Sequence, residues 1–123
     1  MEKSQVSEWL RRYVDAWKSY DRTQIADLFS EDVEYRYHPY DEPERGRDAV
    51  VESWFGDNAD KPGTYDGAYE PVAVDGDTAI AIGYSTYLDA GGSVRKIYDN
   101  CFVMRFDDEG RCRSFTEFYM QRP

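Results

Sequence analysis

The chain has 123 residues, which is enough for one domain around one hydrophobic core, and we expect a single domain spanning residues 1–123. Fifteen basic residues against twenty-five acidic ones give a formal net charge of −10. This balance argues against nucleic acid and anionic membrane surfaces as partners, because both require a basic footprint on the protein.

The beginning of the chain predicts two helices. Between residues 4 and 20, apolar side chains recur every three or four positions, which is typical of one buried helix face. That face consists of Val6, Trp9, Leu10, Tyr13, Val14, Trp17 and Tyr20. Asp21 followed by Gln24 resembles a capping box and predicts a second helix that continues to about Ser30.

A short strand and a third helix follow. Residues 33–37 read as a strand, and Pro39 and Pro43 end regular structure because proline lacks the amide donor that a strand ladder needs. A third helix is expected over 47–55. The polar segment 56–64 contains glycine and proline and is predicted to be a loop.

The second half predicts an antiparallel meander. Strands are expected over 68–74, 78–88, 94–106 and 111–121, separated by Asp- and Gly-rich turns. Helices first and a meander afterwards indicate an α+β fold. The acidic turn at 107–109 is shorter than a calcium-binding loop, and no Cys/His set has zinc spacing, so we expect no metal and no cofactor.

Strand alternation predicts which side chains share a face. In 78–88 the apolar members are Ile80, Ile82 and Tyr84, and in 94–106 the concave set is Tyr98, Asn100, Phe102, Met104 and Phe106. Closing the last turn with Phe106 opposite Arg111 places Phe102 opposite Phe115. The same register places Asn100 opposite Glu117 on the concave side. Arg95 and Asp99 then face solvent or a partner subunit.

The two cysteines are predicted to be free thiols. Cys101 and Cys112 should lie about four rungs apart on neighbouring strands, or ~13 Å, whereas a disulfide needs Cα atoms within ~7 Å. The first residues lack the pattern of a signal peptide, and no apolar run approaches the ~20 residues of a membrane span. We therefore expect a cytoplasmic protein without membrane contact.

Two polar residues are candidates for proton transfer. His38 is the chain's one histidine, the residue type best suited to proton transfer near neutral pH. It could equally be a half-buried histidine that bonds the loop 41–44. Glu117 is flanked by aromatic residues, and burial would make it an acid or base by raising its pKa. It could instead only satisfy the core by bonding Asn100 or Tyr84.

Tyr13 is the third candidate. Its hydroxyl could donate to an oxyanion that develops on a bound substrate. The alternative is that Tyr13 is one more core aromatic on the first helix, as the helical spacing alone predicts.

The order helix–helix–strand–helix–meander resembles the nuclear transport factor 2-like superfamily, and in particular its SnoaL-like members. The resemblance covers the whole chain and rests on the segments 28–33, 105–111 and 115–120, together with Gly46 before the third helix. It implies three helices packed on a strongly curved, mixed but mostly antiparallel sheet. The sheet would form a cone around an apolar cavity, a cystatin-like α+β barrel.

Enzymes of this superfamily suggest roles for particular positions. The oxyanion tyrosine of ketosteroid isomerase falls on Tyr13, and its general base, which precedes a proline, falls on His38. The second oxyanion donor of that enzyme falls on Phe102, which cannot donate. The last-strand aspartate of limonene epoxide hydrolase falls on Glu117, but the Arg-x-Asp pair of that enzyme has no counterpart at 84–86.

The resemblance implies a homodimer, formed through the convex face of the sheet, whose pocket binds a small, mostly apolar or ring-shaped molecule. The expected lining is Trp9, Trp17, Trp54, Tyr84, Asn100, Phe102 and Phe115. One hypothesis is a cofactor-independent isomerase, cyclase or dehydratase in which His38 moves the proton, Glu117 assists and Tyr13 stabilises the oxyanion. The alternatives are a binding module without catalysis, or a protein–protein adaptor whose cone is fully packed.

Overall fold

The structure is a computed structural model, and it describes residues 1–56 and 61–123. Part of the predicted loop 56–64 therefore lies outside the described residues. The helices are α1 (Lys3–Ser19), α2 (Arg22–Asp27) and α3 (Arg47–Trp54). The strands are β1 (Phe29–Arg36), β2 (Glu44–Arg45), β3 (Tyr65–Asp75), β4 (Thr78–Leu88), β5 (Val94–Phe106) and β6 (Cys112–Gln121).

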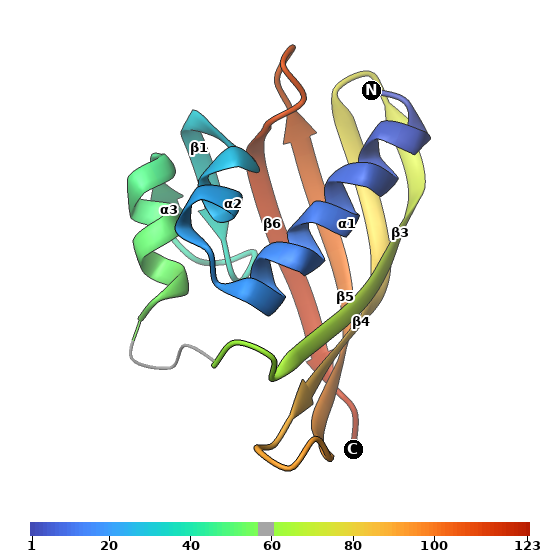
Figure 1. Ribbon diagram of the computed structural model, residues 1–123. Coiled ribbons are helices and arrows are strands. Elements are labelled where there is room, and N and C mark those ends of the chain that lie inside the picture. Colours follow the sequence, from blue (N-terminus) through green and yellow to red (C-terminus); the bar gives the residue numbers. More distant parts are fainter. Residues whose placement is uncertain (57–60) are drawn as a thin grey trace.

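The architecture is the α+β cone that the sequence predicts. The six strands form one curved sheet in the order β2-β1-β6-β5-β4-β3, in which β1 and β6 are parallel and the other neighbours antiparallel. All three helices lie on one side of the sheet (Figure 1). In the described part of the chain the edge strands β2 and β3 do not pair, so the sheet stays open and does not close into a barrel. No described helix is both long enough and apolar enough to cross a membrane.

The second helix ends earlier than predicted. Its start is confirmed, because the Asp21 side chain accepts a hydrogen bond from the amide of Gln24 at 3.0 Å. The helix stops at Asp27, and Ser30, expected in the helix, lies in β1. The reason is tertiary: the Leu28 carbonyl accepts bonds from the Cys112 amide and from the Trp9 indole, both at 2.9 Å. These contacts begin the parallel β1–β6 pairing before another helical turn can form.

Aromatic side chains build the core beneath the helices. The Tyr13 ring stacks on Trp9 and on Phe115, with ring centroids 5.4 and 5.5 Å away. Phe102 packs edge-on against Tyr13 and is 1% exposed. Offset and edge-to-face packing of this kind stabilises a core beyond simple area burial. The apolar face predicted for α1 is confirmed.

The predicted register between β5 and β6 is wrong by two residues. Phe102 lies opposite Glu117, and Asn100 lies opposite Tyr119. One residue of the error arises because the turn closes with Phe106 opposite Cys112, and the second arises at an irregularity between Arg105 and Phe106. A shift of two leaves every side chain on its predicted face. Asn100 and Glu117 therefore still share the concave side as diagonal neighbours, and the predicted polar pair forms by that route.

The prediction for β4 is inverted. The small residues Ala79 and Ala81 face the core and are fully buried, whereas Ile82 and Tyr84 are 46% and 45% exposed on the convex face. Strand β3 lies especially close to Gly83 of β4. A Cβ atom added to Gly83 would lie 2.0 Å from the Ala68 carbonyl oxygen. Gly83 therefore has no room for a side chain, and Ala79 and Ala81 belong to the buried core cluster.

Both cysteines are free thiols, as predicted. Cys112 is buried and pairs with Phe106, which is five positions from Cys101 along β5. The acidic turn is also confirmed as a hairpin: the Asp107 carboxylate accepts the amides of Glu109 and Arg111, each at 2.9 Å.

Candidate functional site

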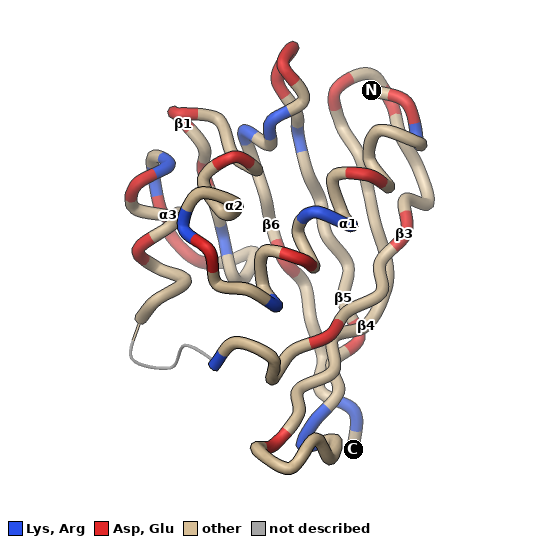
Figure 2. The backbone as a smooth tube through the Cα atoms, viewed as in Figure 1, with Lys and Arg blue, Asp and Glu red and all other residues tan. Residues whose placement is uncertain are grey.

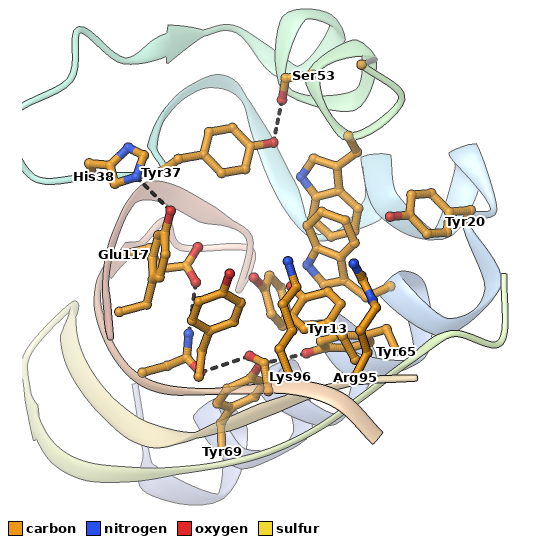
Figure 3. A pocket seen from close by; sticks show the side chains of 18 residues that line it. Tyr13, Tyr20, Tyr37, His38, Ser53, Tyr65, Tyr69, Arg95, Lys96 and Glu117 are labelled. Carbon is orange, nitrogen blue, oxygen red and sulfur yellow. Dashed lines mark hydrogen bonds between the residues drawn. The ribbon is translucent and has the colours of Figure 1, made fainter. Parts of the chain in front are cut away.

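The concave side of the sheet holds a cavity of about 690 Å³. Sites for small molecules usually have volumes of ~300–1,000 Å³. Eight of the chain's eleven tyrosines line it, together with Trp17 and Trp54 (Figure 3). A fully packed cone, as the adaptor hypothesis requires, is not what the structure shows.

The three predicted catalytic candidates line this one cavity. Tyr13 reaches it from α1, His38 from the loop directly after β1, and Glu117 from β6. Residues far apart in sequence are brought together because α1 crosses the concave face while β1 and β6 pair in parallel.

Glu117 is the carboxylate of the cavity wall. Burial raises its pKa from 4.5 to about 7, and a hydrogen bond from the Asn100 amide to Glu117 Oε1, at 2.9 Å, acts in the opposite direction. Withdrawal from water destabilises the charged form more than the single donor stabilises it. Near neutral pH both protonation states of Glu117 are therefore populated, which is what a group that accepts and returns a proton needs.

A chain of hydrogen bonds leads to Glu117 across four strands. Ser85 donates to Asn100 Oδ1 at 2.8 Å, so the Ser85 hydroxyl must accept its contact from the Tyr69 hydroxyl. Tyr69 in turn accepts from the Tyr65 hydroxyl at 2.7 Å. Each hydroxyl has only one proton, which fixes the direction of the whole chain toward the carboxylate. The chain orients Asn100 so that it presents a donor to Glu117.

The tyrosines around Glu117 are held in their protonated form. Burial raises the pKa of Tyr13 well above its usual range, and the nearby Tyr35 and Glu117 raise it further. The Tyr13 and Tyr35 hydroxyl oxygens are 3.4 Å apart, which is long for a hydroxyl pair. Tyr13 is therefore a core aromatic that also lines the cavity, and its role as an oxyanion donor stays a prediction.

His38 is held from both sides. Its Nδ1 lies 2.8 Å from Asp41 Oδ2, and its Nε2 lies 2.7 Å from the Tyr119 hydroxyl. The Asp41 carboxylate can only accept, so Nδ1–H of the ring donates a hydrogen bond to it. In the neutral ring, Nε2 then accepts a hydrogen bond from the Tyr119 hydroxyl. The predicted bond to the loop 41–44 exists, and the further contact makes Tyr119 the link between His38 and the cavity.

The predicted lining is only partly placed at the cavity. Trp17, Trp54 and Asn100 line it. The expectation for the other four was wrong: Trp9, Phe102 and Phe115 are buried in the core below the cavity, and Tyr84 lies on the convex face. The core residues are excluded because Tyr13 and Tyr69 cover them, with the Tyr69 ring centroid 4.6 Å from that of Phe102.

Sequence reasoning missed Tyr69, Ser85, Arg95, Lys96 and Tyr119. The expectation that Arg95 faces away from the pocket was wrong, because the β4–β5 register shifts between Tyr87 and Leu88 and makes Arg95 the extra residue of a bulge. A bulge of this kind redirects a side chain, and alternation along the strand cannot reveal it. For Ser85, one signal was present in the sequence: it lies four residues from Ala81 on the same strand, so the two side chains share a face.

The cavity is more polar than the sequence suggested. Tyrosine counts as apolar in a hydrophobic pattern but carries a hydroxyl, and most of these hydroxyls lie at the cavity wall. The Trp54 indole nitrogen, buried at the same wall, has no hydrogen-bond partner in the described part of the chain. An unpaired buried donor is costly, and a ligand oxygen would satisfy it. Residues 1–56 and 61–123 contain no group of three potential metal ligands.

Comparisons with known proteins agree with this geometry. Residues 10–115 match the SnoaL-like domain family. The chain is also similar to the crystal structure of a "putative ketosteroid isomerase" from Kribbella flavida DSM 17836, with a TM-score of 0.71 and 20% sequence identity. The match covers 98% of this chain and 82% of the other. A search of curated proteins finds no significant match. At this identity, the structural similarity shows the fold alone.

Proposed function

Because the chain belongs to the SnoaL-like domain family of the nuclear transport factor 2-like superfamily, we propose that it binds a small ring-bearing molecule and moves a proton on it without a cofactor. The reaction class is that of an isomerase, cyclase or dehydratase. The observation that carries the proposal is Glu117, a carboxylic acid with a pKa of about 7 at the wall of a cavity of suitable size.

The arrangement supports a division of roles in which Glu117 is the base. Its carboxylate would take a proton from the carbon next to a substrate carbonyl, and the electron pair of that C–H bond would move to form an enolate. The Tyr13 hydroxyl would donate to the enolate oxygen. Where the enolate is conjugated to a C=C bond, Glu117 would then return the proton to the far carbon of that bond as the double bond moves, and no oxidant, reductant or water is consumed. In a ketone without that bond, the proton would return to the same carbon, which appears as hydrogen exchange.

His38 has a supporting role in this proposal. Its Nε2 already accepts from Tyr119, and Asp41 holds its Nδ1. The group that meets the ligand at this corner would be the Tyr119 oxygen, with His38 positioning it. This reverses the roles first expected for His38 and Glu117.

Hydrogen exchange on a ring ketone tests the proposal. In D₂O near neutral pH, the protein should accelerate deuterium incorporation next to the carbonyl of 1-tetralone, followed by ¹H NMR. Glu117→Gln should lower the enzymatic rate by about 10²-fold or more, since that is the usual contribution of a general base. Glu70→Gln, the same change at an exposed strand position, should leave the rate unchanged. Equal rates for all three proteins would refute the proposed chemistry.

A binding module without catalysis is the second candidate. It is favoured by Phe102, which lies at the position of the second oxyanion donor in ketosteroid isomerase and cannot donate a hydrogen bond. Such a module would bind 1-tetralone without accelerating exchange. Its affinity would also change little between pH 5 and pH 9, whereas a proton-transfer site built on Glu117 would respond.

We further propose that the protein is a homodimer through the convex face of the sheet. Neighbouring rungs of β4, β5 and β6 place Ile82, Phe118, Tyr84 and Met120 together on that face. All four are large and exposed, Met120 at 76%. A contiguous apolar patch of this kind marks an interaction surface. Sedimentation equilibrium should give a dimer mass, and Phe118→Glu should give the monomer; a monomeric wild-type protein would contradict this assignment.

A further inference from the structure

Two basic side chains at the cavity mouth contrast with the acidic character of the chain. Arg95 and Lys96 are the two Lys or Arg residues among those that line the cavity, although acidic residues outnumber basic ones by 25 to 15 overall. Figure 2 shows basic segments gathered at the end of the sheet where β5 begins and the chain ends. Figure 3 shows Lys96 and Arg95 next to one another, with His38 on the other side of the cavity.

The backbone brings both cations to the same side. Successive residues of a regular strand point to opposite faces of the sheet. Here Tyr87 pairs with Lys96, but Leu88 pairs with Val94, so Arg95 is the extra residue of a bulge. Both neighbours consequently line the cavity. Bulges are frequent beside functional sites, where they re-aim a side chain.

Lys96 presents its charge at a rim of aromatic rings. Its Nζ lies 5.0 Å from the ring centroid of Tyr87 and 5.2 Å from that of Tyr98. In the described part of the chain no carboxylate forms an ion pair with Lys96. By contrast, the neighbouring Arg122 is neutralised by Asp99 through two bonds of 2.8 and 2.9 Å. Lys96 is therefore a cation held over the cavity by aromatic faces, and its charge is available to a ligand.

The acid-base group lies well away from this cationic rim. Asn100, the partner of Glu117, is four residues beyond Lys96 on the same face of β5. At ~3.3 Å per residue that separation is ~13 Å along the strand. An anionic group bound at the rim would thus lie at the other end of the cavity from Glu117.

We propose that the ligand of this cavity is an anion, a ring-bearing carboxylate whose acid group binds at Lys96 and Arg95 while its ring extends between the tyrosines toward Glu117. The inference rests on the proposed function only in taking the cavity as the ligand site. It adds the charge of the ligand and its direction of binding. A hydrophobic wall with one charged contact at its end is a common way to orient a small ligand.

Paired probes of equal shape test the proposal. Isothermal titration calorimetry at low salt would compare 2-naphthoate with its neutral isostere 2-naphthamide. We expect the wild-type protein to bind the carboxylate at least about tenfold more tightly, a difference of about 1.4 kcal/mol. The double variant Arg95→Met/Lys96→Met should bind the two probes within about twofold of each other. High salt should also reduce the preference of the wild-type protein for the carboxylate, as the double substitution does.

Lys3→Met is the control for an effect of net charge alone, because it replaces one lysine by methionine at an exposed position on α1. It should keep the full preference for the carboxylate. Equal binding of both probes by the wild-type protein, binding of neither, or a preference that survives in the double variant would each overturn the inference. The neutral ketone 1-tetralone has no acid group to bind at the rim. Its exchange rate in Glu117→Gln therefore tests the proposed function independently of the preference for an anion.

Discussion

Replacing Glu117 by Gln should change how the stability of the protein depends on pH. The substitution keeps the size of the side chain and the oxygen that accepts from Asn100, but it removes the titration. The pKa of Glu117 rises from 4.5 to about 7 on folding. Because the folded state binds the proton more tightly, the protonated carboxyl stabilises the protein fully below pH 4.5. That stabilisation is lost as the pH rises through about 7.

The size of this effect follows from the pKa values. A change of one pKa unit corresponds to about 1.4 kcal/mol, so the full effect on the free energy of unfolding is about 3 kcal/mol. Between pH 5 and pH 8, which covers most of the transition, the wild-type protein should lose about 2 to 3 kcal/mol relative to Glu117→Gln. The variant should therefore be close to wild type at pH 5 and clearly more stable at pH 8.

Urea denaturation at the two pH values measures this difference directly. Glu70→Gln serves as the control, since Glu70 is exposed on a strand and its substitution should leave the pH dependence as in the wild type. If Glu117→Gln and the wild-type protein kept the same difference in unfolding free energy at pH 5 and pH 8, the carboxyl would not be destabilised by burial. The assignment of Glu117 as the acid-base group would then lose its physical basis.

Three other predictions concern two side chains of the cavity wall and the packing of β4 against β3. Tyr119→Phe should slow the exchange of 1-tetralone. It should change the unfolding free energy by less than ~1 kcal/mol, because the side chain is 42% exposed and only its hydrogen bond to His38 is lost. An unchanged exchange rate would show that the Tyr119–His38 pair has no role in the reaction. Trp54→Phe should weaken binding of 1-tetralone about tenfold more than binding of the hydrocarbon tetralin, since only the ketone can accept from the indole. Equal losses in a fluorescence titration would contradict that. Gly83→Ala should cost ~1–3 kcal/mol in urea denaturation, because the added Cβ meets the Ala68 carbonyl oxygen, and a neutral result would show that β3 can move away.

The sequence predicts the elements and the faces of this fold better than their pairing. The period of α1 and the turn residues of the meander are local signals, and both are confirmed. The β5–β6 register depends on an irregularity between Arg105 and Phe106 that no local pattern marks. Because the error in the register is two residues, each side chain stays on its predicted face of the sheet, and Asn100 and Glu117 are still in contact.

The contents of the cavity were harder to predict for a different reason. A hydrophobic pattern does not separate a tyrosine whose ring is buried from one whose hydroxyl lines a cavity. Tyr69 and Tyr119 were therefore not recognised as site residues. On β4, hydrophobicity does not indicate the buried face: Ala81 is fully buried and Ile82 is 46% exposed. Such tertiary constraints become visible only once the strands are placed.

An acid-base role for Glu117 requires its carboxyl to titrate near neutrality inside the cavity that binds the ligand. The most direct test is ¹³C NMR of the Glu117 carboxyl carbon, titrated without ligand and with saturating 1-tetralone, and assigned by its loss in Glu117→Gln. We predict a midpoint at about pH 7 in the free protein. A neutral ligand that displaces water should move it higher. A midpoint near 4.5 that the ketone leaves unchanged would contradict the account.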